Sequence, residues 1–245
     1  MSSTRVTPAF DRRAASYDAH AHVQRETAAW VAEWLPAPGR FVRCLEFGAG
    51  TGNFTRHLIG RFNAVVATDL APAMVEQGRL AVPAAEWRTN DAWAPSPPPP
   101  DLDFIAACSV LQWAPDPTTC LARWRAGLAP DARVLAGIYI HPSLPEFGEL
   151  LPDHRPFPWR GADEWVAHFR AAGWTVTRVE DRTRAYHYPD ARSLLRQLHG
   201  TGTTPSDSRL GPGAMRDFIR RYDTLFAGPE GVRATWTTCR IEACA

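Results

Sequence analysis

Lysine is absent from this sequence, and all 27 of its basic residues are arginine. They are balanced by 26 acidic residues, so the formal net charge is only +1. Proteins that bind nucleic acid usually carry a strong basic excess, so this balance argues against a general polyanion-binding role and predicts no nucleic-acid partner. The use of arginine in place of lysine is explained most simply by GC-rich codons.

Long apolar runs are also absent. No stretch approaches the roughly 18 uninterrupted apolar residues that a membrane-spanning helix needs, so we expect no membrane partner. Residues 1–11 are polar and show neither the apolar core nor the cleavage pattern of a secretory signal. These observations predict a cytoplasmic protein.

Cysteine is scarce, and neither cysteine nor histidine follows the spacing of metal ligands. The cysteines, none in a C-x-x-C pair, are Cys44, Cys108, Cys120, Cys239 and Cys244. The histidines nearest the N-terminus, His20, His22 and His57, also lack ligand spacing. We therefore predict reduced cysteines that pack in the core, and no metal site.

Short apolar runs alternate with stretches of helical pattern, which is typical of an α/β fold with helices covering a parallel sheet. Five predicted strands occupy the first part of the chain, at 41–47, 64–70, 86–89, 103–111 and 133–140. Two later β-like runs, 174–188 and 235–243, would complete the sheet as a hairpin-like pair. We predict seven strands, mostly parallel, with the last one antiparallel.

The length of 245 residues suits one domain with a small insertion. The insertion is expected between the last two strands, where a helical pattern is interrupted by a Gly/Thr/Pro/Ser-rich break too long for a tight turn. We predict a single domain over 1–245, with an N-terminal helical lid at 1–36 and a helical cap at 190–228.

Three glycines, Gly48, Gly50 and Gly52, lie directly after the first predicted strand. Because glycine has no Cβ, a backbone rich in it can turn sharply and approach a bound nucleoside. The second strand ends at Asp69, whose two carboxylate oxygens can accept hydrogen bonds from both hydroxyls of a ribose. The pattern indicates a nucleoside-containing cofactor at the carboxyl edge of the sheet.

Two kinds of enzyme fit this fingerprint, a dinucleotide oxidoreductase and an S-adenosylmethionine methyltransferase. The third glycine comes sooner than in G-x-G-x-x-G, which leaves less room for a pyrophosphate and resembles motif I of class I methyltransferases. Asn90, Asp91 and Ala92 resemble the acidic turn that such enzymes use beside the adenine, although Asp91 alone could be a turn cap. Together these features favour a Rossmann-like class I methyltransferase fold with S-adenosylmethionine as cofactor.

A closer resemblance, to the malonyl-[acyl-carrier-protein] O-methyltransferase (BioC) family, covers nearly the whole chain. Four segments that share it are Phe10-Asp11-Arg12-Arg13-Ala14-Ala15-Ser16-Tyr17-Asp18, Gln24-Arg25-Glu26, Leu111-Gln112-Trp113 and Ser143-Leu144-Pro145-Glu146. The most specific is Ser193-Leu194-Leu195-Arg196-Gln197-Leu198-His199-Gly200-Thr201-Gly202 in the predicted cap, which resembles the family's L-x-x-L-K-x-x-G. His199 departs from it, since many relatives carry lysine or arginine there, and would make a contact with an acidic partner weaker and pH-sensitive.

The resemblance implies a set of cofactor contacts. Glu46, where aspartate is common, would hold the methionyl amine of S-adenosylmethionine directly or through water, and Asp69 would hold the ribose. The predicted cofactor-binding residues are Glu46, Phe47, Gly48, Ala49, Gly50, Gly52, Asp69, Leu70, Met74, Asn90, Asp91, Ala92 and Ser109.

It also implies a reaction, in which the methyl group passes to the free carboxylate of malonyl-acyl carrier protein and primes pimeloyl formation for biotin. A carboxylate, with a pKa of about 4, is ionised at neutral pH and needs no general base. The predicted catalytic residues are Tyr17 on the lid, Gln112 at the fourth strand and Arg155 as a clamp for the carboxylate. Arg155 is otherwise a surface arginine beside a proline-rich loop.

An acidic carrier protein would be steered by a basic face around the mouth of the pocket. Candidate residues are Arg182, Arg184, Arg192, Arg196, Arg216, Arg220 and Arg221, which could equally form a solvated helix face. Whether malonyl-CoA serves in place of the carrier protein stays open. The sequence is also compatible with methylation of another small acid or quinone-like molecule, with a non-catalytic S-adenosylmethionine-binding protein, and with an NAD-linked oxidoreductase.

Overall fold

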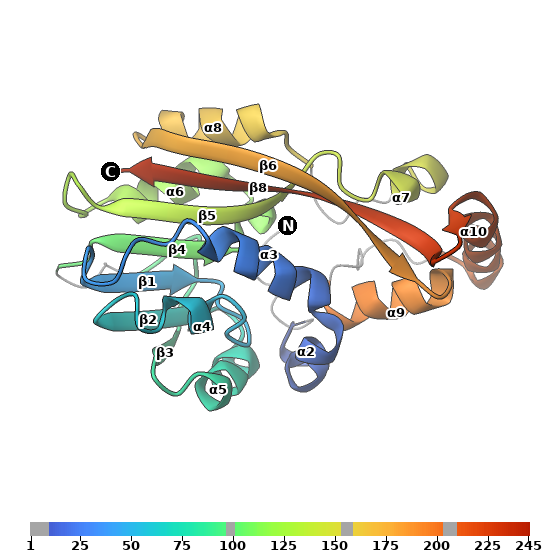
Figure 1. Cartoon of the computed structure of the whole chain (residues 1–245), viewed down its shortest axis with the longest axis horizontal. Helices are drawn as coiled ribbons and strands as arrows, with labels where there is room; N and C mark the ends of the chain where they lie inside the picture. Colours follow the sequence, from blue (N-terminus) through green and yellow to red (C-terminus); the bar gives the residue numbers. More distant parts are fainter. Residues whose placement is uncertain (1–9, 97–100, 153–158, 203–209) are drawn as a thin grey trace.

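The computed structural model describes residues 10–96, 101–152, 159–202 and 210–245. A twisted sheet with the order β3-β2-β1-β4-β5-β8-β6 runs through the centre of the molecule (Figure 1). Its strands are β1 (Arg43–Phe47), β2 (Ala64–Asp69), β3 (Glu86–Thr89), β4 (Phe104–Cys108), β5 (Arg133–Ile140), β6 (Thr175–Tyr188) and β8 (Gly231–Cys244). The first five are parallel, and β8 is antiparallel to both β5 and β6. The predicted α/β class with an antiparallel final strand is confirmed.

The sheet has one strand that the sequence pattern did not predict. β7 (Ala227–Gly228) is only two residues long and pairs with the start of β8. A two-residue strand has no detectable period, so only the hairpin geometry reveals it. The last long strand also begins earlier than predicted, at Gly231 instead of 235.

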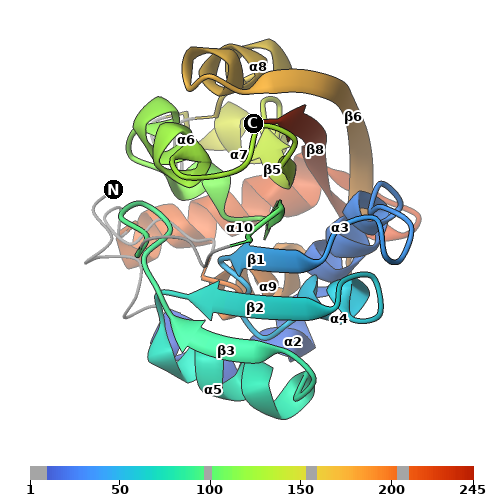
Figure 2. The same ribbon diagram turned by 90° about the vertical axis from the view of Figure 1, so that its left-hand side faces the viewer.

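Helices cover both faces of the sheet, because neighbouring strand residues point to opposite sides. On one face, β1 contributes Leu45 and Phe47 to a core with α6 (Pro117–Arg125) and α8 (Ala162–Ala171). On the other face, Cys44 packs with α3 (His22–Ala32), α4 (Thr55–Leu58) and α5 (Pro72–Ala81). Figure 1 shows α3 in front of the sheet and α6 behind it, and Figure 2 shows the same layers from the side.

β6 and β8 are each 14 residues long and extend past the other strands. Around this extension gather α7 (Pro145–Leu150), α9 (Ala191–Gly200) and α10 (Pro212–Leu225) (Figure 1). They share a third apolar core with Tyr139, Tyr188 and Trp236 at the ends of β5, β6 and β8. The helices α9 and α10 fall in the segment predicted as a cap, whose function as a cap stays a prediction.

The N-terminal segment, from Phe10 to Leu35, forms the short helices η1 (Ala14–Ser16) and α2 (Tyr17–His20) and then α3. We call this segment the leader. Trp30 and Val31 are buried in the last turns of α3. Trp34 lies beyond the end of the helix and is only half-buried, because its ring lies between two arginines instead of in the apolar core.

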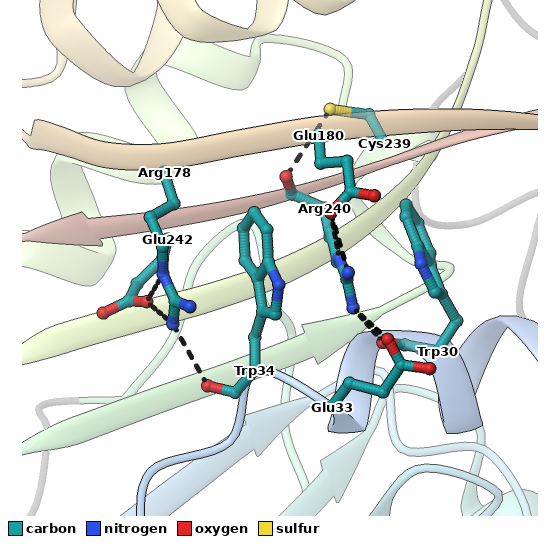
Figure 3. A network of polar contacts seen from close by, with 8 residues as sticks. All are labelled: Trp30, Glu33, Trp34, Arg178, Glu180, Cys239, Arg240 and Glu242. Atoms are coloured by element: carbon teal, nitrogen blue, oxygen red, sulfur yellow. Dashed lines mark hydrogen bonds and ion pairs between the residues drawn. The ribbon is translucent and has the colours of Figure 1, made fainter.

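Arginines and tryptophans alternate where the leader crosses the sheet (Figure 3). The guanidinium carbon of Arg240, on β8, lies 4.3 Å from the ring centroids of both Trp30 and Trp34. Arg182 and Arg178, on β6, stack over the outer faces of the same rings, at 4.3 and 4.4 Å. We call these five residues the Arg–Trp ladder, and it fixes the end of the leader to β6 and β8.

Ion pairs support the centre of this ladder. Arg240 is 5% exposed, and its guanidinium bonds Glu180 at 2.7 Å and Glu33 at 3.0 Å. A buried arginine is tolerated only when its charge is paired, and here two carboxylates and two aromatic faces surround it. Within the described ranges, no helix is long and apolar enough to cross a membrane.

Candidate active site

A cavity opens at the carboxyl ends of β1, β2 and β4, where the order of the strands reverses. This is the position at which open α/β sheets bind ligands. Including its open mouth, the space is about 1180 Å³, which is enough for a nucleoside and a second small group. The leader and the C-terminal end of α9 close it from the side opposite the sheet.

The glycine loop after β1 forms one wall. Gly48 has a φ of +66°, and a Cβ there would lie 2.4 Å from a methyl carbon of Val110. Gly50 has a φ of +55°, and a Cβ there would meet no atom within 4 Å. Both positions favour glycine through their backbone conformation. Gly48 also needs it for packing, whereas Gly50 lies against open space in the cavity.

Asp69 ends β2 and is held by backbone donors on both carboxylate oxygens. The Gly50 N–H donates to Oδ2 and the Ala71 N–H donates to Oδ1, each at 2.9 Å. Burial raises the pKa of Asp69, and these two N–H groups oppose the shift. The carboxylate is thereby oriented toward the cavity with acceptor capacity left on each oxygen.

Glu46, on β1, is almost completely buried, at 1% exposed. Its hydrogen-bond partner is Thr55, whose hydroxyl donates to Oε2 at 2.7 Å. Burial raises the pKa of Glu46 to about 8, the Thr55 hydroxyl opposes the rise, and the nearby Asp69 adds to it. A buried carboxyl group with so little compensation is suited to a cationic ligand, which would restore its ionised form.

The structure brings most of the predicted site residues together. Those that line the cavity are Tyr17, Glu46, Gly48, Ala49, Gly50, Asp69, Leu70, Met74, Asn90, Asp91, Ala92, Ser109 and Gln112. Phe47 and Gly52 do not line it. The ring of Phe47 stacks on Trp124 at 4.6 Å in the core under the opposite face of the sheet, and Gly52 packs against Val82. Arg155 lies outside the described residues.

The cavity has two chemically different sides. The ends of β1, β2 and β3 form an acidic side with Glu46, Asp69 and Asp91, and no arginine is among the described lining residues. The ends of β4 and β5, together with α3, form a neutral side. Its polar residues are Gln24, Cys108, Ser109, Gln112 and Tyr139.

Sequence reasoning missed Gln24, Cys108 and Tyr139. Cys108 and Tyr139 lie in apolar runs whose pattern marks them as core residues, and burial does raise the pKa of the Cys108 thiol to about 12. Gln24 belongs to a segment that was singled out only for its resemblance. No local signal shows that these three side chains line one cavity, because they come from α3, β4 and β5.

Three buried side-chain oxygens in lining residues have no hydrogen-bond partner: Oε1 of Gln24, Oδ1 of Asn53 and Oε1 of Gln112. The orientation of Gln112 is set because its Nε2 donates to the Ser109 carbonyl at 2.8 Å. Buried acceptors of this kind are normally satisfied, so a ligand with N–H or O–H donors fits here. Together with the carboxylates, they fit S-adenosylmethionine, which carries an ammonium, a sulfonium and two ribose hydroxyls.

The leader covers the acidic side through α2. Asp18 accepts hydrogen bonds from the Thr51 hydroxyl at 2.6 Å and from the Asn53 amide at 3.2 Å, both on the glycine loop. Tyr17, next in the chain, lines the cavity, and burial, with the nearby Asp69 as a second cause, raises its pKa. The phenol is therefore a hydrogen-bond donor over the whole physiological range.

The arginines predicted as a carrier-binding face fall into two groups. Arg182 stacks on Trp30, and Arg184 pairs with Glu26 at 2.7 Å, so both contact the leader. Arg192, Arg196, Arg216, Arg220 and Arg221 are exposed on α9 and α10. His199 lies 3.1 Å from a nitrogen of Arg13, beside the mouth of the cavity. A carrier-binding role for these residues stays a prediction.

Comparison with known proteins supports one family. Residues 45–134 match the family described as "Methyltransferase domain". The chain is 33% identical over 98% of its length to the biotin biosynthesis bifunctional protein BioHC of Cellvibrio japonicus, and it spans half of that protein. It is 30% identical to malonyl-[acyl-carrier protein] O-methyltransferase of Serratia marcescens, over 81% of this chain and 78% of that one. It is also 30% identical to trans-aconitate 2-methyltransferase of Methylobacterium nodulans, over 79% of each.

Solved structures show the same fold. The YcgJ protein of Bacillus subtilis superimposes with a TM-score of 0.65 at 16% identity, over 89% of this chain and 97% of that one. A geranyl diphosphate methyltransferase, solved in complex with S-adenosylmethionine, superimposes with a TM-score of 0.57 at 13% identity, over 90% of this chain and 84% of that one.

Proposed function

This chain belongs to the class I S-adenosylmethionine-dependent methyltransferases, and from that premise we propose that it methylates the free carboxylate of malonyl-acyl carrier protein. The proposed product is the malonyl methyl ester. S-adenosylmethionine, when bound, supplies an electrophilic methyl group. The remaining question is which nucleophile the neutral side of the cavity is built to receive.

One observation carries the choice of a carboxylate. Among the described residues, the titratable groups on or beside the neutral side are Tyr17, Cys108 and Tyr139, and burial raises the pKa of each, that of Cys108 to about 12. These groups stay protonated at neutral pH, so they can donate hydrogen bonds but do not remove a proton. An alcohol or phenol would need such a base, whereas a carboxylate is already ionised.

The residues of the acidic side have a separate task. We propose that Glu46 pairs with the methionyl ammonium, that Asp69 accepts hydrogen bonds from the ribose, and that Asp91 lies beside the adenine. The other predicted lining residues shape the same subsite. Gln112 on the neutral side, and Tyr17, which reaches the cavity from α2, are proposed to orient the acceptor carboxylate. The proposed clamp, Arg155, lies outside the described residues.

The placement of the leader and α9 supports a substrate with a long arm. These two segments carry the resemblance to the malonyl-carrier enzymes outside the nucleotide core, and they meet at the mouth of the cavity. The ring centroids of Phe10 and Trp113 are 6.1 Å apart, and the Phe10 ring also lies against Gly202, just beyond α9. A carrier-bound malonyl group would enter between them, while the carrier would rest on the exposed arginines.

A free acid is the second candidate, because trans-aconitate 2-methyltransferases are as similar to this chain as the malonyl-carrier enzymes. It also needs no general base. A free acid would need neither a channel for the pantetheine arm of a carrier protein nor a surface that binds the carrier.

Transfer of labelled methyl groups to malonyl-carrier protein, acetyl-carrier protein, malonyl-CoA and trans-aconitate distinguishes these candidates. We expect a base-labile ester on malonyl-carrier protein and none on the acetyl form, which lacks the carboxylate. Labelling of trans-aconitate alone would contradict the proposed substrate and keep carboxyl methylation. Labelling of none, with intact S-adenosylmethionine binding, would contradict both.

A further inference from the structure

A chain of hydrogen bonds joins the leader to the cap at the edge of the cavity. The Gln197 amide, on α9, lies between two histidine rings of the leader. Its Oε1 is 2.8 Å from Nδ1 of His20, and its Nε2 is 2.9 Å from Nδ1 of His22. The other nitrogen of His22 is 3.2 Å from the hydroxyl of Tyr188 at the end of β6. The amide thus connects α9 with α2 and α3, and the His22 ring extends the chain to β6.

The chemistry of these atoms specifies the protonation of both rings. An amide NH2 only donates, so Nδ1 of His22 must be unprotonated to accept from it. The amide oxygen only accepts, so Nδ1 of His20 must carry a proton. Rotating the amide by 180° exchanges the two roles but still requires one protonated and one unprotonated Nδ1. When both rings are protonated at both nitrogens, one contact becomes N–H facing N–H and is lost.

Packing holds the rings in place around this amide. A Cβ at position 200 would lie 2.3 Å from the His20 ring, so Gly200 allows the ring to lie directly on α9. The ring of His22 meets those of Tyr186 and Tyr188 edge-on, with centroids 5.6 Å apart in each case. Packing as well as hydrogen bonding therefore holds both rings beside Gln197.

The charged groups around the histidines come from each neighbouring element. On α3, Glu26 favours and Arg25 opposes a positive charge on His22, and the phenol of Tyr186 on β6 is bonded to Glu26 at 3.1 Å. On α2, Asp18 is engaged with the glycine loop. Next to Gln197 on α9, His199 is bonded to Arg13. No carboxylate among these accepts a hydrogen bond from either Nδ1.

The histidines act on the site through α2, which is only four residues long. Tyr17 at its start lines the cavity, Asp18 is bonded to the glycine loop, and His20 at its end is bonded to Gln197. When both rings are protonated, the amide oxygen can accept from either His20 or His22, and α2 loses its bond to Gln197 whenever the oxygen faces His22. The helix is then held over the cavity through Asp18. The orientation of the Tyr17 side chain thus depends on Gln197, which does not touch the cavity.

We propose that Gln197 is a positioning residue for methyl transfer, and that its amide is a pH-sensitive latch that holds α2 over the cavity while at least one of His20 and His22 is neutral. The inference rests on methyl transfer in this cavity, whichever acceptor is used. Burial, the largest cause, lowers the pKa of His22 in the latched state. The latch is thus fully effective above the ordinary histidine pKa of about 6.5 and weakens as the pH falls below it.

The test compares Gln197→Glu and Gln197→Leu with the parent between pH 5 and 8. A carboxylate accepts from two imidazolium rings, so we expect Gln197→Glu to shift the acid limb of kcat downward by about one pH unit, a tenfold change in proton affinity. Gln197→Leu keeps a similar volume without hydrogen bonds, and should lower kcat at pH 7.5 about tenfold and remove the histidine-dependent limb. Gln77→Glu, on α5 and outside both the cavity lining and the chain of hydrogen bonds around Gln197, makes the same chemical change as a control.

Proton NMR titration of His22 gives a readout that needs no acceptor. We expect its pKa to rise in Gln197→Glu and to be unchanged in Gln77→Glu. An acid limb in Gln197→Glu identical to that of the parent, or an unchanged His22 titration, would overturn the latch. If no acceptor is methylated, the titration and S-adenosylhomocysteine affinity still test the latch, so its failure is separate from that of the proposed substrate.

Discussion

The floor and the cover of the cavity are built in different ways. The floor consists of the strand ends with Glu46, Gly50, Asp69 and Asp91, which lie within 45 positions of one another. Asp69 is oriented by two backbone N–H groups, and Glu46 by the Thr55 hydroxyl. The cover joins the leader to α9 across 177 positions, through the side chains of His20 and Gln197. The floor is part of the sheet itself, whereas the cover is joined to the sheet through side chains. We therefore expect the floor to determine affinity for the cofactor and the cover to determine when the site closes.

The largest effect should come from breaking the floor at Asp69. In Asp69→Ala the Gly50 and Ala71 N–H groups lose their acceptor, and the ribose loses both of its proposed acceptors. We expect S-adenosylmethionine to bind about 100-fold more weakly, equivalent to about 3 kcal/mol. Calorimetric titration measures this, with Asp163→Ala on the exposed surface of α8 as control. Affinity within threefold of the parent would show that Asp69 does not hold the ligand.

Replacing Arg240, at the centre of the Arg–Trp ladder, should weaken the attachment of the cover without changing the affinity of the floor for the cofactor. Arg240→Met retains an apolar stem but loses two cation–π contacts and pairs with Glu33 and Glu180. Because both glutamates are about half exposed, they can be solvated, and we expect unfolding to become easier by about 2 kcal/mol. Thermal denaturation measures the change, and cofactor affinity at 25 °C should stay within about threefold. A large loss of affinity with unchanged stability would reverse this assignment.

The ionisation of Glu46 should make the floor itself sensitive to pH. With a pKa of about 8, the ligand-free carboxyl group is mostly protonated at neutral pH and must lose its proton to pair with an ammonium. Affinity for S-adenosylmethionine should therefore rise about tenfold from pH 6 to pH 7, since one proton is released on binding. Glu46→Gln should remove this dependence. If the affinity of Glu46→Gln depended on pH as steeply as that of the parent, the role of Glu46 ionisation would be contradicted.

We expect the smallest effect from removing one hydroxyl group of the cover. Tyr17→Phe preserves the ring that packs near Phe10 but removes the proposed donor to the acceptor carboxylate. We expect kcat/KM to fall about fivefold, which is about 1 kcal/mol, with S-adenosylmethionine affinity unchanged. Steady-state kinetics with the acceptor varied measures it. A fall in cofactor affinity instead would place the hydroxyl on the cofactor.

The floor could be predicted because its information is local. The strands at 86–89 and 133–140 have the predicted limits, and the glycine loop and Asp69 follow their strands directly. Their place at one edge then follows from the parallel sheet. Phe47 was predicted in the same site, but its ring packs against Trp124 in the core, because neighbouring strand residues point to opposite faces of the sheet.

The rest required the tertiary structure. No period in the chain relates Gln197 to His20 and His22, or Arg240 to Trp30 and Trp34, because each contact forms only after the extended ends of β6 and β8 bring the cap and the leader together. The amino-acid sequence by itself determined the α/β class, the glycine loop and the acids at the strand ends, since those depend on side-chain alternation and backbone conformation. The packing of distant segments decided which neutral groups face the acceptor and what holds α2 over them, since a long-range contact depends on the path of the whole chain.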